Sequence, residues 1–134
     1  MVFPEFQDSS TVDSRYPITF ENLIPALLHR VPEFGKTRDP EDDKLPCMQL
    51  SAFALFIGGR IDQGMEEDCV LERSFALLNA MGQSTDFRVV NLLTVCVLET
   101  LTNHARWMRA AEQNLQGQAL EALHEIERFW KGEG

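Results

Sequence analysis

The chain has 134 residues, of which 12 are Lys or Arg and 21 are Asp or Glu, so its formal net charge is −9. Hydrophobic residues make up 44% and charged residues 25%, an ordinary globular composition that excludes a disordered acidic tail, a collagen-like repeat and a disulfide scaffold. An acidic surface repels phosphate backbones and anionic membranes, so we expect no nucleic acid and no membrane as partner, but a basic protein or a second copy of the chain.

The length predicts one domain, large enough to bury a core without the help of a metal or a disulfide. The three cysteines, Cys47, Cys69 and Cys96, are odd in number and widely spaced, so we expect free, mostly buried thiols in a reducing compartment. The first residues lack the basic start and apolar run of a signal peptide, and the longest uncharged stretch, residues 45–59, is too short to span a bilayer. These features predict a cytoplasmic protein.

All six prolines lie within the first 46 residues, and proline interrupts helices. We therefore expect residues 1–18 to form an N-terminal arm packed on the body, and residues 19–134 to form a single helical domain. A first helix is predicted from about Asn22, which can cap it, to Val31, because Pro32 then stops it.

A polar loop is predicted over residues 35–46. It contains the densest acidic cluster of the chain, formed by Asp39, Glu41, Asp42 and Asp43. Such a cluster is either a solvated loop or a contact for a basic partner, and the sequence leaves both interpretations open.

Two helices are predicted next, over residues 50–63 and 66–81. In the first, Gly58 and Gly59 are unfavourable for a helix, so we expect an end or a kink there, or the close approach of another backbone. The second begins with acidic residues, which suit the helix dipole, and Gly82 ends it.

The most apolar segment of the chain covers residues 87–104. Its apolar residues surround the helix axis, which is typical of a buried helix, and its length favours a helix over a strand. Helices over residues 105–116 and 118–131 follow. The sequence thus predicts an all-α, single-domain bundle of about five or six helices around a buried central helix at about residues 87–103.

Glu99 interrupts this apolar helix, and a buried carboxylate is costly unless it is paired. It lies at the surface or beside a structural arginine, or it faces a pocket in which His104 or His124 assists it in binding a ligand or in acid–base chemistry. Glu121 and His124 have the spacing of half a di-metal site, but no second pair occurs. Because zinc-binding, phosphate-binding and catalytic motifs are also missing, we expect no metal, no cofactor and no catalytic residue.

Trp107 lies between Arg106, Met108 and Arg109 in the sequence. It is either an anchor of the core or, because aromatic residues, Met and Arg are enriched at interfaces, part of a partner-binding surface.

One set of mostly apolar positions extends through the chain: Phe20, Leu23, Ile24, Val31-Pro32-Glu33-Phe34, Asn91-Leu92-Leu93, Leu98-Glu99-x-Leu101 and Phe129-Trp130. In these positions residues 18–131 resemble small all-helical bacterial proteins of uncharacterised function, some of them similar to immunity proteins that neutralise contact-delivered toxins. The resemblance implies a helical fold and no catalytic residue.

Three functions are compatible with these features. The leading hypothesis is a non-enzymatic, immunity-like binding protein whose acidic surface masks a basic protein partner. The second is a small-molecule-binding or enzymatic helical domain with a pocket near Glu99. The third is a homo-oligomeric structural protein whose helices pack across a two-fold axis.

Overall fold

The structure of the protein, a computed structural model, describes residues 17–36, 45–64 and 68–130. Within these ranges every regular element is a helix, which confirms the predicted all-α fold. Two predictions lie outside the described residues: the packing of the arm up to residue 16, and the loop that carries Asp39, Glu41, Asp42 and Asp43.

The described helices follow one another along the chain with short connections. They are α2 (Leu23–Arg30), α3 (Pro32–Gly35), α4 (Pro46–Asp62), α5 (Cys69–Gly82), α6 (Phe87–Leu92), the π-helix η2 (Leu93–Leu98), α7 (Glu99–Thr102), α8 (Ala105–Asn114) and α9 (Gly117–Trp130). Because α6, η2 and α7 join without a break, we call residues 87–102 the central helix.

Local sequence signals explain where these helices begin. The carboxylate of Asp68 accepts a hydrogen bond from the Val70 amide at 3.1 Å and caps α5. Asp86 caps the central helix in the same way, through the Arg88 amide at 3.0 Å. An aspartate at this position satisfies an amide that has no partner within the helix. Helix α4 begins at Pro46, four residues before the predicted start, because proline fits the first turn of a helix.

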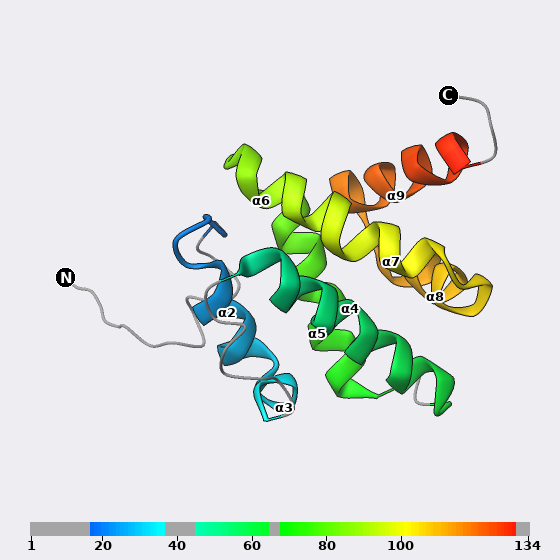
Figure 1. The fold of residues 1–134 in the computed structure, drawn as a ribbon, viewed down its shortest axis with the longest axis horizontal. Helices are drawn as coiled ribbons and strands as arrows, with labels where there is room; N and C mark the ends of the chain where they lie inside the picture. Colours follow the sequence, from blue (N-terminus) through cyan, green and yellow to red (C-terminus); the bar gives the residue numbers. More distant parts are fainter. Residues whose placement is uncertain (1–16, 37–44, 65–67, 131–134) are drawn as a thin grey trace.

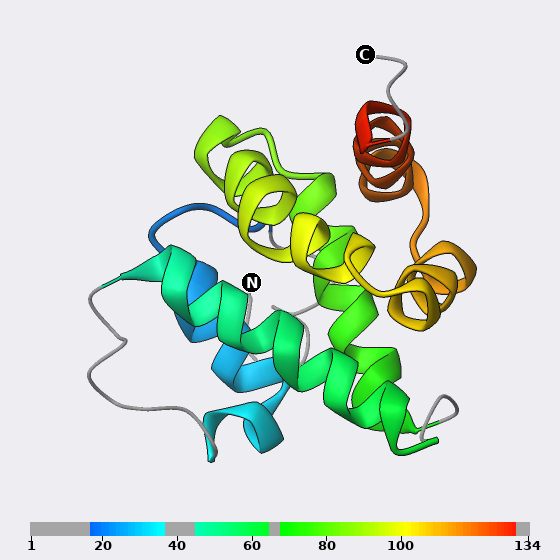
Figure 2. The same ribbon diagram turned by 45° about the vertical axis from the view of Figure 1, so that its right-hand side comes forward.

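The central helix packs on α4 and α5 along one side and on α9 along another, while α2 and α3 pack together beside α5 (Figures 1 and 2). Its inward residues Leu93, Val97 and Leu98 have no solvent exposure. Phe87 and Val95, however, are 78% and 47% exposed, so part of its surface faces solvent and is available to form a wall of a surface site.

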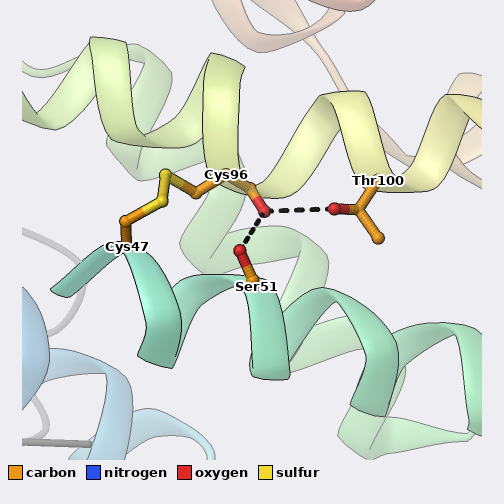
Figure 3. Close-up of a disulfide and its surroundings, with 4 residues drawn as sticks. All are labelled: Cys47, Ser51, Cys96 and Thr100. Atoms are coloured by element: carbon orange, nitrogen blue, oxygen red, sulfur yellow. Dashed lines mark hydrogen bonds between the residues drawn. A yellow bond between two sulfur atoms is a disulfide. The ribbon is translucent and has the colours of Figure 1, made fainter. Parts of the chain in front are cut away.

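Two cysteines form a disulfide, so the prediction of free thiols is wrong for both. Cys47, in the first turn of α4, is bonded to Cys96 of η2, with 5.5 Å between their α-carbons (Figure 3). The packing of α4 beside η2 brings the two within the range that a disulfide requires, although they are 49 residues apart in sequence. Cys69 is a free thiol, but it is exposed and not a core residue as predicted.

Hydrogen bonds reinforce this link between α4 and the π-helix. The carbonyl oxygen of Cys96 accepts from the hydroxyl of Ser51 in α4 and from that of Thr100, each at 3.3 Å (Figure 3). One turn earlier, the Thr94 hydroxyl donates to the Val90 carbonyl at 3.0 Å. Side chains thus satisfy carbonyl groups in and beside a segment whose backbone departs from the α-helical register.

None of the described helices combines the length and the apolar character that crossing a bilayer requires.

Candidate functional site

Glu99 is half-buried and lies at the edge of a surface hollow, between the central helix and α9. The hollow has a volume of about 290 Å³ and is lined by Thr94, Glu99, Ala122, Glu125, Ile126 and Phe129. A second hollow of about 490 Å³ is lined by Gly82, Gln83, Ser84, Val90, Leu93, Thr94, Gln118, Glu121, Ala122 and Glu125. Because Thr94, Ala122 and Glu125 belong to both, we treat the two hollows as one feature, the acidic groove.

Helix α9 forms one wall of this groove with a single stripe of residues. The stripe consists of Gln118, Glu121, Ala122, Glu125, Ile126 and Phe129. This spacing of three and four residues places all six on one face of a helix. The opposite wall comes from the central helix, where Val90 contributes apolar surface and Thr94 a methyl group, while Leu93 is fully buried. The lining of the groove is therefore partly apolar and partly polar.

Three carboxylates, those of Glu99, Glu121 and Glu125, line the groove, and among the described residues no Lys or Arg lines it. In the described part of the chain, none of the three takes part in an ion pair. Carboxylates concentrated along a cleft with low-dielectric walls produce a negative potential that attracts cations.

Several arginines are engaged in ion pairs away from the groove. Arg73 of α5 donates two hydrogen bonds to the Glu33 carboxylate of α3, at 3.0 and 2.9 Å, and a third to the Arg30 carbonyl at 2.8 Å. The Arg73 side chain lowers the pKa of Glu33 to about 2, chiefly through these hydrogen bonds. Arg60 pairs with Asp68 in the same manner. These pairs tie the helices together and engage Arg60 and Arg73 outside the groove.

Asp86 is held by a similar arrangement at the start of the central helix. Hydrogen bonds from the Arg88 side chain and from the Phe20 amide lower the pKa of Asp86 to about 2. The Phe20 bond, at 2.9 Å, attaches the segment before α2 to the central helix. The role of this carboxylate is therefore structural.

The two histidines predicted to assist Glu99 lie elsewhere. His104 precedes α8 and is exposed, and its ring lies 3.8 Å from that of Trp107 between centroids. His124 extends from α9 towards α8, where its Nε2 lies 3.7 Å from a carboxylate oxygen of Glu112. Neither histidine lines the groove, so the structure does not bring together the three residues predicted for a ligand site.

Trp107 lies in the core. Its side chain is only 6% exposed, it packs against Gly58 of α4, and its indole Nε1 donates a hydrogen bond to the Asp62 carboxylate at 3.0 Å. Of the two interpretations that the sequence leaves open, this environment supports the core anchor. It also explains the glycine pair of α4, because the helix continues through Gly58 and Gly59 to Asp62 and a side chain, not a backbone, approaches it.

Sequence reasoning overlooked Glu121 and Glu125 as members of one acidic site with Glu99. The available signal was the stripe along α9, which lies next to the face that buries Ala119 and Leu123. What the sequence could not show is that this stripe borders the exposed side of the central helix.

Comparison with family models identifies the relatives of the chain. The model of a domain of unknown function, DUF7674, matches residues 20–131, which include all of the described helices. The chain belongs to the DUF7674 family. The acidic groove therefore lies entirely within the DUF7674 domain.

Comparison with curated proteins and with solved structures finds no match. The description of the DUF7674 family names no activity, and none of the comparisons shows a relation to immunity proteins. The immunity-like role of this DUF7674 domain remains a prediction.

Proposed function

We propose that the protein is a non-enzymatic binding protein whose acidic groove takes up a basic, partly apolar segment of a protein partner. The observation that carries this proposal is the lining of the groove, in which three carboxylates occur together with apolar residues and which includes no Lys or Arg from the described part of the chain. An immunity-like role, with a toxin as the partner, is one form of the proposal.

The chemistry of the groove defines the kind of segment that fits it. Val90, Ala122 and Phe129 are at least partly exposed and offer apolar contacts, while Glu121 and Glu125 stand one helical turn apart on α9. A segment with apolar side chains flanked by Lys or Arg, as on one face of an amphipathic helix, satisfies both features. Volumes of about 490 and 290 Å³ accommodate a few side chains of such a segment.

Binding rather than catalysis is further supported by the hydroxyl groups of the groove. The Thr94 hydroxyl donates to the Val90 carbonyl, and that of Ser84 donates to the Ile18 carbonyl. Both protons are therefore engaged by the backbone, and no histidine lines the groove to act as a base for either.

The test uses a fluorescently labelled Leu/Lys amphipathic peptide as probe, in fluorescence anisotropy at low salt with EDTA. We expect the double variant Glu121→Gln, Glu125→Gln to bind it about 5- to 30-fold more weakly, since two partly exposed ion pairs contribute about 1–2 kcal/mol. Raising the salt should weaken wild-type binding and narrow this difference.

A matched control removes the same number of negative charges outside the groove, through Glu72→Gln and Glu112→Gln. If the control loses as much affinity as the groove variant, or if the groove variant binds like wild type, the groove is not the binding site. A probe with Gln in place of Lys should bind weakly to all of these proteins.

A second candidate ligand is a small organic cation, because Glu99 and Glu125 line the same hollow of about 290 Å³. This retains the alternative of a small-molecule site near Glu99. A polyamine that competes with the peptide, with an affinity reduced by Glu99→Gln, would favour it. Homo-oligomerisation stays a prediction, which light scattering can test.

A further inference from the structure

Three potential metal ligands converge between α8 and α9, away from the acidic groove. They are Glu112 of α8 and His124 and Glu127 of α9, whose ligand atoms all lie within 4.8 Å of one another. His124 Nε2 lies 3.7 Å from a Glu112 carboxylate oxygen. We propose that these three residues bind a divalent transition-metal ion, with Zn²⁺ as the best fit.

The ligand set matches the chemistry of zinc. One imidazole nitrogen and two carboxylate oxygens are ligands that Zn²⁺ accepts, whereas Mg²⁺ and Ca²⁺ prefer oxygen alone. Bonds of about 2.0–2.2 Å in a tetrahedral arrangement place neighbouring ligand atoms roughly 3.4 Å apart. The 3.7 Å separation between His124 and Glu112 is close to this value.

The ligand atoms of the three residues lie up to 4.8 Å apart, and side-chain rotation can bring them closer together. The side chains of His124 and Glu112 are 42% and 38% exposed, so they can turn without disturbing the core. Three protein ligands leave the fourth position of the ion open to water, because the site lies at the surface.

The fold fixes the backbones that carry these ligands. Only Leu115 and Gln116 lie between α8 and α9, and Leu115 is buried. The Gln116 amide donates to Asn79 of α5 at 2.8 Å, which holds the turn against the body of the bundle. His124 and Glu127 are three residues apart and therefore share a face of α9. A bound ion would thus join two helices that are already positioned for it.

This set differs from the pair that the sequence suggests. The sequence places Glu121 and His124 at a metal-ligand spacing and predicts no metal, because a second pair is missing. In the structure Glu121 lines the acidic groove, whereas His124 is close to Glu112 of the neighbouring helix. The two glutamates therefore give a direct way to test which partner His124 uses.

The experiment is a calorimetric titration of Zn²⁺ into the full chain carrying Cys69→Ser, since the exposed thiol would otherwise compete for the ion. We expect one ion per chain at this site and a melting temperature that rises with Zn²⁺. Glu112→Gln, His124→Ala and Glu127→Gln should each weaken binding at least ~10-fold, the lower end of what the loss of an outer partner costs at metal sites.

Glu121→Gln is the matched control and should bind Zn²⁺ like the parent. Melting in EDTA verifies that every variant is folded. The proposal is overturned if His124→Ala retains the affinity of the parent, or if Glu121→Gln loses affinity while Glu112→Gln does not. Neither result depends on the groove, whose test is carried out in EDTA.

Discussion

The indole of Trp107 occupies the space that a side chain at Gly58 would need. A β-carbon built on Gly58 would lie 2.3 Å from both Cε2 and Cζ2 of the indole. The adjoining hydrogen bond from Trp107 to Asp62 holds the ring in this position. Glycine at residue 58 therefore lets α8 dock closely on α4.

Replacing this glycine should destabilise the protein. In Gly58→Ala the new methyl group collides with the ring, which costs about 1–3 kcal/mol as overpacking in a core does. Gly59→Ala is the control, because no atom lies within 4 Å of its β-carbon and alanine favours a helix by about 0.5–1 kcal/mol. Urea unfolding should show a lower free energy of unfolding for Gly58→Ala and a higher one for Gly59→Ala, each relative to wild type. A Gly58→Ala protein as stable as wild type would show that the ring can move away.

This pair also illustrates what the sequence could and could not predict. Apolar periodicity and capping residues located the described helices apart from α3, because both are properties of neighbouring residues. They also marked Gly58 and Gly59 as unusual in a helix. Which glycine is needed, and that Trp107 is the reason, depends on how α8 lies on α4, and no local pattern records that.

A second close approach joins α5 and α9 at Gly82. A β-carbon there would lie 2.7 Å from the backbone nitrogen of Ala119 and 3.0 Å from its β-carbon. Since neither atom belongs to a flexible side chain, Gly82→Ala should force the helices apart and cost about 1–3 kcal/mol.

The same substitution connects the fold with the site. Gly82 lines the acidic groove, and α9 forms one of its walls. We therefore expect Gly82→Ala also to lower the affinity for the basic peptide probe. Fluorescence anisotropy can measure this under conditions in which the variant is folded. Gly59→Ala again serves as the control, and unchanged peptide affinity in folded Gly82→Ala would show that the groove tolerates a shift of α9.

The disulfide should contribute substantially to stability. It closes a loop of 49 residues between Cys47 and Cys96, and the chain-entropy relation gives a stabilisation of about 4 kcal/mol for a loop of this length. Cys96→Ser should therefore lower the free energy of unfolding by up to that amount. Cys69→Ser should have little effect, because the thiol is exposed. Thiol titration of the native protein should find one reactive group, and three would contradict the pairing.

The groove shows why the site was less predictable than the fold. Glu99 was identified because a carboxylate in an apolar helix is locally unusual. Glu121 and Glu125 are ordinary residues of an amphipathic helix, and they become part of a site only because α9 packs beside the central helix. His124 was combined with Glu121 on the basis of spacing, but its Nε2 lies 3.7 Å from a carboxylate oxygen of Glu112 on another helix.

Finally, the Glu33–Arg73 pair should make stability depend on pH in the acid range. The pKa of Glu33 in the folded protein is about 2, whereas an unperturbed glutamate has a pKa of about 4.3. A depressed folded-state pKa stabilises the protein fully above the unfolded-state value, and this contribution disappears as the pH falls from about 5 to about 2. Because both side chains are 38% exposed, we expect no more than about 1 kcal/mol at neutral pH.

Glu33→Gln should remove this contribution while leaving the bond from Arg73 to the Arg30 carbonyl in place. Urea unfolding at pH 7 should then show a small loss of stability, and the difference from wild type should shrink towards zero as the pH is lowered to about 2. Glu72→Gln, on the same helix as Arg73, should parallel wild type throughout. Equal acid dependence in wild type and Glu33→Gln would mean that the pair contributes nothing to folding, since the difference between the two proteins isolates this carboxylate from Asp68 and Asp86.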